Sequence, residues 1–100
     1  MPELTTGQSI NKALELILDK DPTAFIAGED IGVYGGAFGV TEGLLDKFGQ
    51  DRIKDTPIAE DVIAGLAVGA SMTGSRPIVE MQFSDFIVNA MDPIVNQAAK

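Results

Sequence analysis

The amino-acid sequence predicts an α/β fold: a parallel β-sheet with helices on both of its faces. Helical and strand segments alternate along the whole chain, and such alternation is typical of parallel strands joined by right-handed helical crossovers. The first strand candidate is apolar throughout, as expected for a strand covered on both faces. With 45% hydrophobic and 22% charged residues, the 100-residue chain has the composition of an ordinary globular domain.

The first helix is predicted over residues 6–19. Thr5 and Gln8 have the spacing of a capping box, and Asp21-Pro22 ends the helix because a residue before proline avoids helical geometry. Its apolar positions recur at helical spacing and predict one buried stripe: Ile10, Ala13, Leu14 and Ile17.

Residues 24–27 are predicted to form the first strand, which ends at Gly28. The glycine-rich loop that follows, residues 28–39, lacks the Gly-Lys-Ser/Thr of a phosphate-binding loop and does not lead straight into a helix. Turn formation is therefore favoured over phosphate binding. The adjacent acids Glu29 and Asp30 could ligate a metal, but a solvated loop is the favoured interpretation.

The remaining elements follow in order: a short helix from Thr41 to Phe48, a strand at 52–56, a helix at about 59–73, a strand at 76–83 and a helix from Phe86 onward. Thr41 is expected to cap the short helix and Gly49 to end it. The last helix is still in progress at Lys100, with no capping Gly or Asn after it, so we expect a fragment of a larger domain.

Composition excludes several classes of function. Seven basic against fifteen acidic residues give a net charge of −8, which argues against nucleic acid and anionic membranes as partners. Cysteine and histidine are absent, so this segment has no disulfide framework, thiolate nucleophile or zinc site. No signal peptide or membrane span is recognisable, and we expect a location in the bacterial cytoplasm or the mitochondrial matrix.

Glu60 begins the third predicted helix, at the edge of the sheet where parallel α/β folds bind ligands. An acid in the first turn also favours the helix dipole by about 0.3–1 kcal/mol, which is a sufficient structural reason for its presence. Gly65 and Gly69 of the same helix each cost about 1 kcal/mol of helix propensity relative to Ala. They predict that another backbone approaches closely, either a second subunit or this chain's own sheet.

The pattern Glu60, four residues, Gly65, Leu66, two residues, Gly69 resembles the pyrimidine-domain motif of thiamin-diphosphate enzymes. Further segments make almost the whole chain similar to the β subunits of 2-oxo acid dehydrogenases: Gly28-Glu29-Asp30, residues 34–38, 41–44 and 55–60, residues 73–78, and Gln82-Phe83-Ser84-Asp85-Phe86. The resemblance implies that residues 1–100 are the N-terminal part of a pyrimidine-binding α/β domain. The rest of that domain and a separate C-terminal domain are then absent.

The resemblance implies a role for four residues. Glu60 corresponds to the catalytic carboxyl group that hydrogen-bonds the aminopyrimidine ring of thiamin diphosphate and activates the cofactor. Ile58, Gln82 and Phe86 correspond, with Glu60, to cofactor-binding residues. The enzyme would decarboxylate a 2-oxo acid, with pyruvate favoured, and pass the acyl group to a lipoyl acyltransferase.

The resemblance also implies a site divided between two chains. An α subunit would hold the diphosphate and its Mg²⁺, so no metal ligand is assigned here, and the fragment alone is expected to be inactive. The expected partners are the α subunit, a second β subunit, the lipoyl acyltransferase and a small 2-oxo acid.

Several alternatives stay open at this point. Branched-chain 2-oxo acid and acetoin dehydrogenase β subunits share these motifs. Transketolase-like and deoxyxylulose-phosphate-synthase-like pyrimidine domains fit less well, because the segments at 55–57 and 82–86 favour the dehydrogenase branch. A non-enzymatic flavodoxin-like domain would need a phosphoacceptor Asp with a suitably placed Lys, and the sequence offers no such pair.

Overall fold

The computed structural model describes residues 4–32, 34–36, 39–81 and 90–94 of the chain. Three strands, β1 (Ala24–Gly28), β2 (Ile53–Asp55) and β3 (Arg76–Glu80), form one sheet in the order β2-β1-β3. Both pairings are parallel. The predicted α/β fold with a parallel sheet is thus confirmed.

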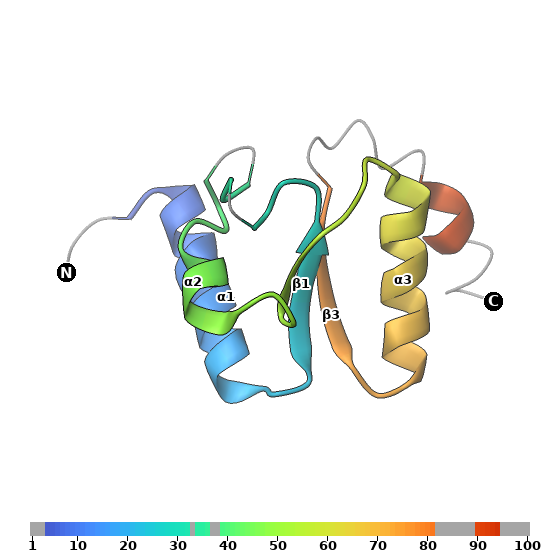
Figure 1. The fold of residues 1–100 in the computed structure, drawn as a ribbon, viewed down its shortest axis with the longest axis horizontal. Helices are drawn as coiled ribbons and strands as arrows, with labels where there is room; N and C mark the ends of the chain where they lie inside the picture. Colours follow the sequence, from blue (N-terminus) through green and yellow to red (C-terminus); the bar gives the residue numbers. More distant parts are fainter. Residues whose placement is uncertain (1–3, 33, 37–38, 82–89, 95–100) are drawn as a thin grey trace.

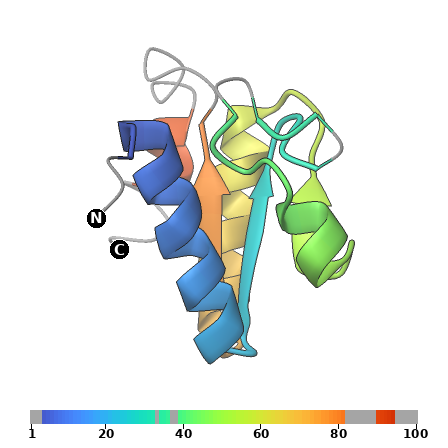
Figure 2. The same cartoon turned by 90° about the vertical axis from the view of Figure 1, so that its left-hand side faces the viewer.

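The sheet is covered on both faces, as predicted (Figures 1 and 2). The helices α1 (Thr6–Lys20) and α2 (Leu44–Phe48) lie on one face, and α3 (Glu60–Met72) lies on the other. The carboxyl ends of the strands and the first turns of α1 and α3 share one end of the molecule, the upper end in Figure 1. Loops that leave the strands at this end can therefore contact the start of α3.

The hydrophobic core lies between the sheet and the pair α1 and α2. Its buried members are Leu14, Leu18, Ala24, Ile26, Ile31, Leu44 and Ile53. On the opposite side, α3 buries Ile63 and Ala64. The central strand β1 is buried at every position except the half-buried Phe25, so the prediction of a strand covered on both faces is confirmed.

Helix α1 has the predicted capping box, in which Thr5 accepts from Gln8 N and the Gln8 side chain accepts from Thr5 N. The predicted buried stripe is partly wrong. Ile10 and Ile17 are 44% and 42% exposed, and Leu14 and Leu18 are the buried residues of the helix. The sheet contacts α1 along a line narrower than the full apolar face, and residues four apart lie on that line.

The prediction that Thr41 caps the second helix is wrong. Helix α2 begins at Leu44, and its N-cap is Gly43, which has a φ of 82° and no side chain to accept a hydrogen bond. The Thr41 hydroxyl instead donates to the Ile31 carbonyl oxygen at 2.8 Å and is buried. Gly49 ends the helix as predicted. Thr41 therefore supports the glycine-rich loop.

The last two predicted elements are described in part. Strand β3 is described to its end at Glu80, and residues 90–94 form a short helical segment. Gln82, Phe83 and the predicted helix start at Phe86 lie outside the described residues.

Candidate functional site

Polar side chains gather where the three parallel strands end. Glu29 follows β1, Thr56 follows β2, Glu80 closes β3, and Glu60 begins α3. The register places Gly28 of β1 opposite both Asp55 of β2 and Glu80 of β3. This is the edge at which open parallel sheets bind ligands. We refer to Glu29, Thr56, Glu60 and Glu80 as the carboxyl-edge group.

Glu60 is buried, with 7% of its surface exposed, although it is the first residue of a helix. The positive end of the helix dipole stabilises a carboxylate at this position. A residue that only complements the dipole would be expected in solvent, because burying a charged carboxylate costs free energy. The burial of Glu60 therefore favours a binding or catalytic role over a purely structural one.

Glu29 is still more buried, at 3% exposed, and neither of its carboxyl oxygens has a hydrogen-bond partner among the described residues. Burial raises the pKa of this carboxyl group, and the nearby carboxyl groups of Glu60 and Asp30 raise it further. Glu29 is thus a buried carboxyl group that keeps its proton to a higher pH than an ordinary glutamate does.

The expectation that the acids after β1 form a solvated loop holds for Asp30, which is exposed, and is wrong for Glu29. The sequence contains a weak indication that Glu29 is buried. Glu29 directly follows the three consecutive buried residues that end β1, so it continues a buried segment.

Two further polar groups of the carboxyl-edge group lack partners within the described chain. They are the Thr56 hydroxyl and one carboxyl oxygen of Glu80. Burial raises the pKa of Glu80 as well. Buried polar atoms in native proteins are nearly always hydrogen-bonded, so orphaned oxygens gathered at one edge indicate a polar molecule or partner that binds there.

The predicted cofactor-binding residues are only partly described. Ile58 lies on the connection between β2 and α3, two residues before Glu60, and is 77% exposed. An exposed apolar side chain at this place is available for contact with a bound molecule. Gln82 and Phe86 lie outside the described residues.

The glycines of α3 face open space in the described part of the chain. A Cβ atom added at Gly65 or Gly69 would meet no atom within 4 Å. The alternative that these glycines pack tightly against the chain's own sheet is therefore wrong. Close approach of a second chain stays a prediction.

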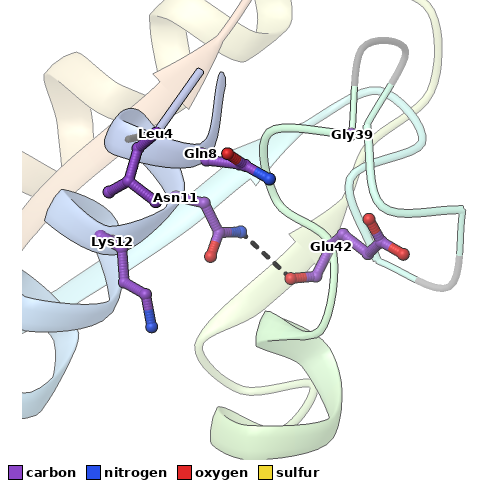
Figure 3. A pocket seen from close by; sticks show the side chains of 6 residues that line it. All are labelled: Leu4, Gln8, Asn11, Lys12, Gly39 and Glu42. Carbon is purple, nitrogen blue, oxygen red and sulfur yellow. Dashed lines mark hydrogen bonds between the residues drawn. The ribbon is translucent and has the colours of Figure 1, made fainter. Parts of the chain in front are cut away.

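The glycine-rich loop lies beside α1, where the two line an open pocket of about 270 Å³ (Figure 3). The Asn11 side-chain amide donates to the Glu42 carbonyl oxygen at 3.1 Å, as drawn in the figure, and to the Val40 carbonyl oxygen at 2.7 Å. The lining residues include no member of the carboxyl-edge group. This pocket is distinct from the candidate site, and its hydrogen bonds fasten the loop to the helix.

Within the described ranges, no three acidic side chains are grouped closely enough to hold a metal ion. Over the same residues, no helix is long and apolar enough to cross a membrane.

Comparison with known proteins agrees with this arrangement. The model of the transketolase pyrimidine-binding domain matches residues 2–100, and the chain therefore belongs to this family. The membership excludes the flavodoxin-like alternative.

Within this family, the chain is similar to β subunits of 2-oxo acid dehydrogenases. The chain is 49% identical over 92 residues to the 2-oxoisovalerate dehydrogenase subunit beta of Bacillus subtilis. It is 47% identical over 100 residues to the pyruvate dehydrogenase E1 component subunit beta of Staphylococcus epidermidis, and 48% identical over 98 residues to the mitochondrial counterpart of Dictyostelium discoideum. These matches cover 92%, 100% and 98% of the chain but only 28%, 31% and 28% of the relatives. The predicted resemblance to the N-terminal part of such β subunits is confirmed.

Proposed function

We propose that the chain is the N-terminal part of the β subunit of a thiamin-diphosphate-dependent 2-oxo acid dehydrogenase, with Glu60 as its catalytic carboxyl group. The observation that carries the proposal is the burial of Glu60 at the start of α3, on the ligand-binding edge of a parallel sheet. The family match and the similarity to dehydrogenase β subunits support it.

The chemistry of the carboxyl-edge group fits an aminopyrimidine ring. Such a ring offers a nitrogen that accepts a hydrogen bond and an amino group that donates one, so it can pair with carboxyl groups in either protonation state. The orphaned oxygens of Glu29 and Glu80 and the buried carboxyl group of Glu60 provide such partners. Thiamin diphosphate, when bound, supplies the nucleophilic carbon that attacks the 2-oxo acid and accepts the electrons released by decarboxylation.

Glu60 would hold the shared proton at the ring nitrogen. A carboxyl group within hydrogen-bonding distance of the ring nitrogen can take part in the proton transfer that activates the ring. Ile58, Gln82 and Phe86 would bind the ring by apolar and polar contact. The diphosphate and its Mg²⁺ are assigned to the α subunit.

The chain spans about 30% of the length of the relatives it matches. We propose that residues 1–100 begin the pyrimidine-binding domain, and that the rest of this domain and a C-terminal domain follow. The proposed partners are the α subunit, a second β subunit and the lipoyl acyltransferase, in the bacterial cytoplasm or the mitochondrial matrix.

Pyruvate is the favoured substrate, and a branched-chain 2-oxo acid is the second candidate. The second has specific support, because the 2-oxoisovalerate dehydrogenase subunit is as similar to this chain as the pyruvate dehydrogenase subunits are. Turnover of pyruvate and of 2-oxoisovalerate by the complete α/β enzyme distinguishes the two.

The role of Glu60 is tested by Glu60→Gln in the complete α/β enzyme. Loss of a positioned acid–base group lowers turnover by about a hundredfold or more, and assembly should be retained because the amide has the same shape. Glu42→Gln, which changes an exposed glutamate, is the matched control. Near-normal turnover of Glu60→Gln at saturating thiamin diphosphate would remove Glu60 from the mechanism.

A further inference from the structure

A hydrogen bond from a side chain ties the end of β2 to the loop that follows β1. Asp55 closes β2, and its carboxylate oxygen Oδ1 accepts from the Gly32 backbone N–H at 2.7 Å. The next residue, Thr56, donates its backbone N–H to the Gly28 carbonyl oxygen at 2.9 Å. These two bonds lie on either side of residues 29–31, so they hold both ends of the turn that contains Glu29.

Gly32 makes the approach of the carboxylate possible. A Cβ atom at position 32 would lie 2.5 Å from Asp55 Oδ2, closer than real Cβ contacts come. The absence of a side chain therefore serves contact with Asp55. Asp55 at the end of β2 thus contacts a position in the loop after β1 that only glycine fits.

The turn between Gly28 and Gly32 needs such support, because its conformation is unfavourable by itself. Asp30 has a φ of 53°, in the left-handed region that non-glycine residues rarely adopt. Its carbonyl oxygen accepts from Gly36 N–H at 2.8 Å, and the Ile31 carbonyl oxygen accepts from the Thr41 hydroxyl at 2.8 Å. Asp55 adds the hydrogen bond that joins this turn to the neighbouring strand.

The turn determines where the Glu29 side chain lies. Glu29 is 3% exposed, and it lies near the carboxyl groups of Glu60 from α3 and Asp30 from the same turn. Glu80, at the end of β3, pairs with the preceding residue, Gly28. A turn released from β2 would admit water to this carboxyl group. Asp55 itself is exposed, so a role in filling the core does not account for it.

We propose that Asp55 is a positioning residue that, through the Gly32 N–H, keeps the Glu29 carboxyl group buried beside Glu60. Any effect of Asp55 on catalysis rests on the proposed function, whereas its effect on the position of Glu29 does not.

The test follows the protonation of Glu29 rather than turnover. In the complete α/β enzyme, infrared spectroscopy detects the C=O stretch of a protonated carboxyl group, and the part of the band lost in Glu29→Gln belongs to Glu29. Titration of that band is compared in Asp55→Ala, Asp55→Asn and Gly32→Ala. Asp51→Ala, which removes an exposed acid just before β2, is the matched control.

We expect Asp55→Ala and Gly32→Ala to lower the titration midpoint of Glu29 towards the ordinary glutamate range. Asp55→Asn, which keeps an oxygen acceptor without the charge, should restore most of the original midpoint, and Asp51→Ala should leave it unchanged. An unchanged midpoint in a folded Asp55→Ala or Gly32→Ala enzyme would overturn the proposal. So would a midpoint equally lowered in Asp55→Asn, because the charge and not the hydrogen bond would then matter.

A Glu29 band that titrates in the ordinary glutamate range in the unsubstituted enzyme would also overturn the proposal. None of these results depends on decarboxylation, so they are distinguishable from a failure of the Glu60→Gln experiment.

Discussion

The two faces of the sheet are built differently. The face towards α1 and α2 is closed by large aliphatic side chains of this chain, among them Leu14, Leu18 and Leu44. The face towards α3 buries Ile63 and Ala64 but leaves Val62 54% exposed and Met72 76% exposed. Gly65 and Gly69 meet nothing within 4 Å. The face towards α1 and α2 has the larger aliphatic core, although α1 leaves Ile10 and Ile17 exposed, whereas α3 keeps a smooth and partly apolar outer surface.

The difference indicates that α3 has a second role besides covering the sheet. Glycine inside a helix costs about 1 kcal/mol relative to Ala, and the described chain offers no contact that offsets this cost. A chain that spans about 30% of its relatives' length can leave such a surface to be covered by other segments or subunits. The same helix presents Glu60 at its first position, so assembly and catalysis would meet on one element.

The largest expected effect concerns the core between the sheet and the helices α1 and α2. Leu18→Ala removes a side chain that is 1% exposed, and such a change typically costs about 2–5 kcal/mol of unfolding free energy. Val62→Ala on α3, a comparable truncation at an exposed position, should change the unfolding free energy by less than about 0.5 kcal/mol. Urea unfolding of the isolated β chain measures both. Equal losses would contradict the assignment of Leu18 to the core and of Val62 to an open surface.

A second prediction concerns the smooth surface of α3. Gly69→Leu should weaken subunit association in the complete enzyme, because overpacking a tight contact costs about 1–3 kcal/mol. The isolated β chain should not lose stability, since the position is open and leucine favours helix. Ser71→Leu, exposed on the opposite side of the helix, is the control.

Analytical ultracentrifugation at nanomolar protein measures the association of the Gly69→Leu enzyme. Unchanged assembly together with a drop in thermal stability of the isolated β chain would assign the glycines to packing within the chain.

A smaller effect is expected from the pH dependence of Glu29. Its raised pKa means that the folded chain keeps a proton that the unfolded chain releases above its ordinary value of 4.5. Stability therefore falls as pH rises from 4.5 towards the folded pKa, and is level above it. Glu29→Gln should make this fall shallower, as followed by thermal unfolding across the pH range. Identical slopes in the two proteins would show that Glu29 titrates normally.

The smallest effect is expected at the capping box of α1, which lies on the opposite face of the sheet from α3. Thr5→Ala removes the acceptor of the Gln8 N–H and should cost about 1 kcal/mol of stability. Thr6→Ala, one position into the helix, controls for the loss of a hydroxyl group. Thermal unfolding that shows the same change for both variants would contradict a capping role for Thr5.

The local signals of the sequence predicted the elements well. The predicted elements lie within a few residues of the observed ones. The helix ends were indicated by Asp21-Pro22, Gly49 and Gly74, and the order of the elements by the alternation of helices and strands. The position of Glu60 followed from the same reasoning, because a helix that follows a parallel strand begins at the carboxyl edge.

Tertiary contacts explain what the sequence could not predict. Thr41 has the residue type and position of a helix cap, yet its hydroxyl bonds to Ile31, a contact that depends on how the loop folds back. Glu29 has the sequence position of a solvated loop acid, but the folded chain buries it near Glu60 of α3. The hydrogen bond between Asp55 and Gly32 spans 23 residues and leaves no local pattern.

The structure of the complete α/β enzyme with thiamin diphosphate bound tests the central claim most directly. The measured quantity is the distance between the Glu60 carboxyl oxygens and the nitrogens of the aminopyrimidine ring. We expect a hydrogen bond of about 2.6–3.2 Å, with α3 covered by a second chain over Gly65 and Gly69. A ring bound elsewhere, with the Glu60 carboxyl group contacting only protein, would contradict the account.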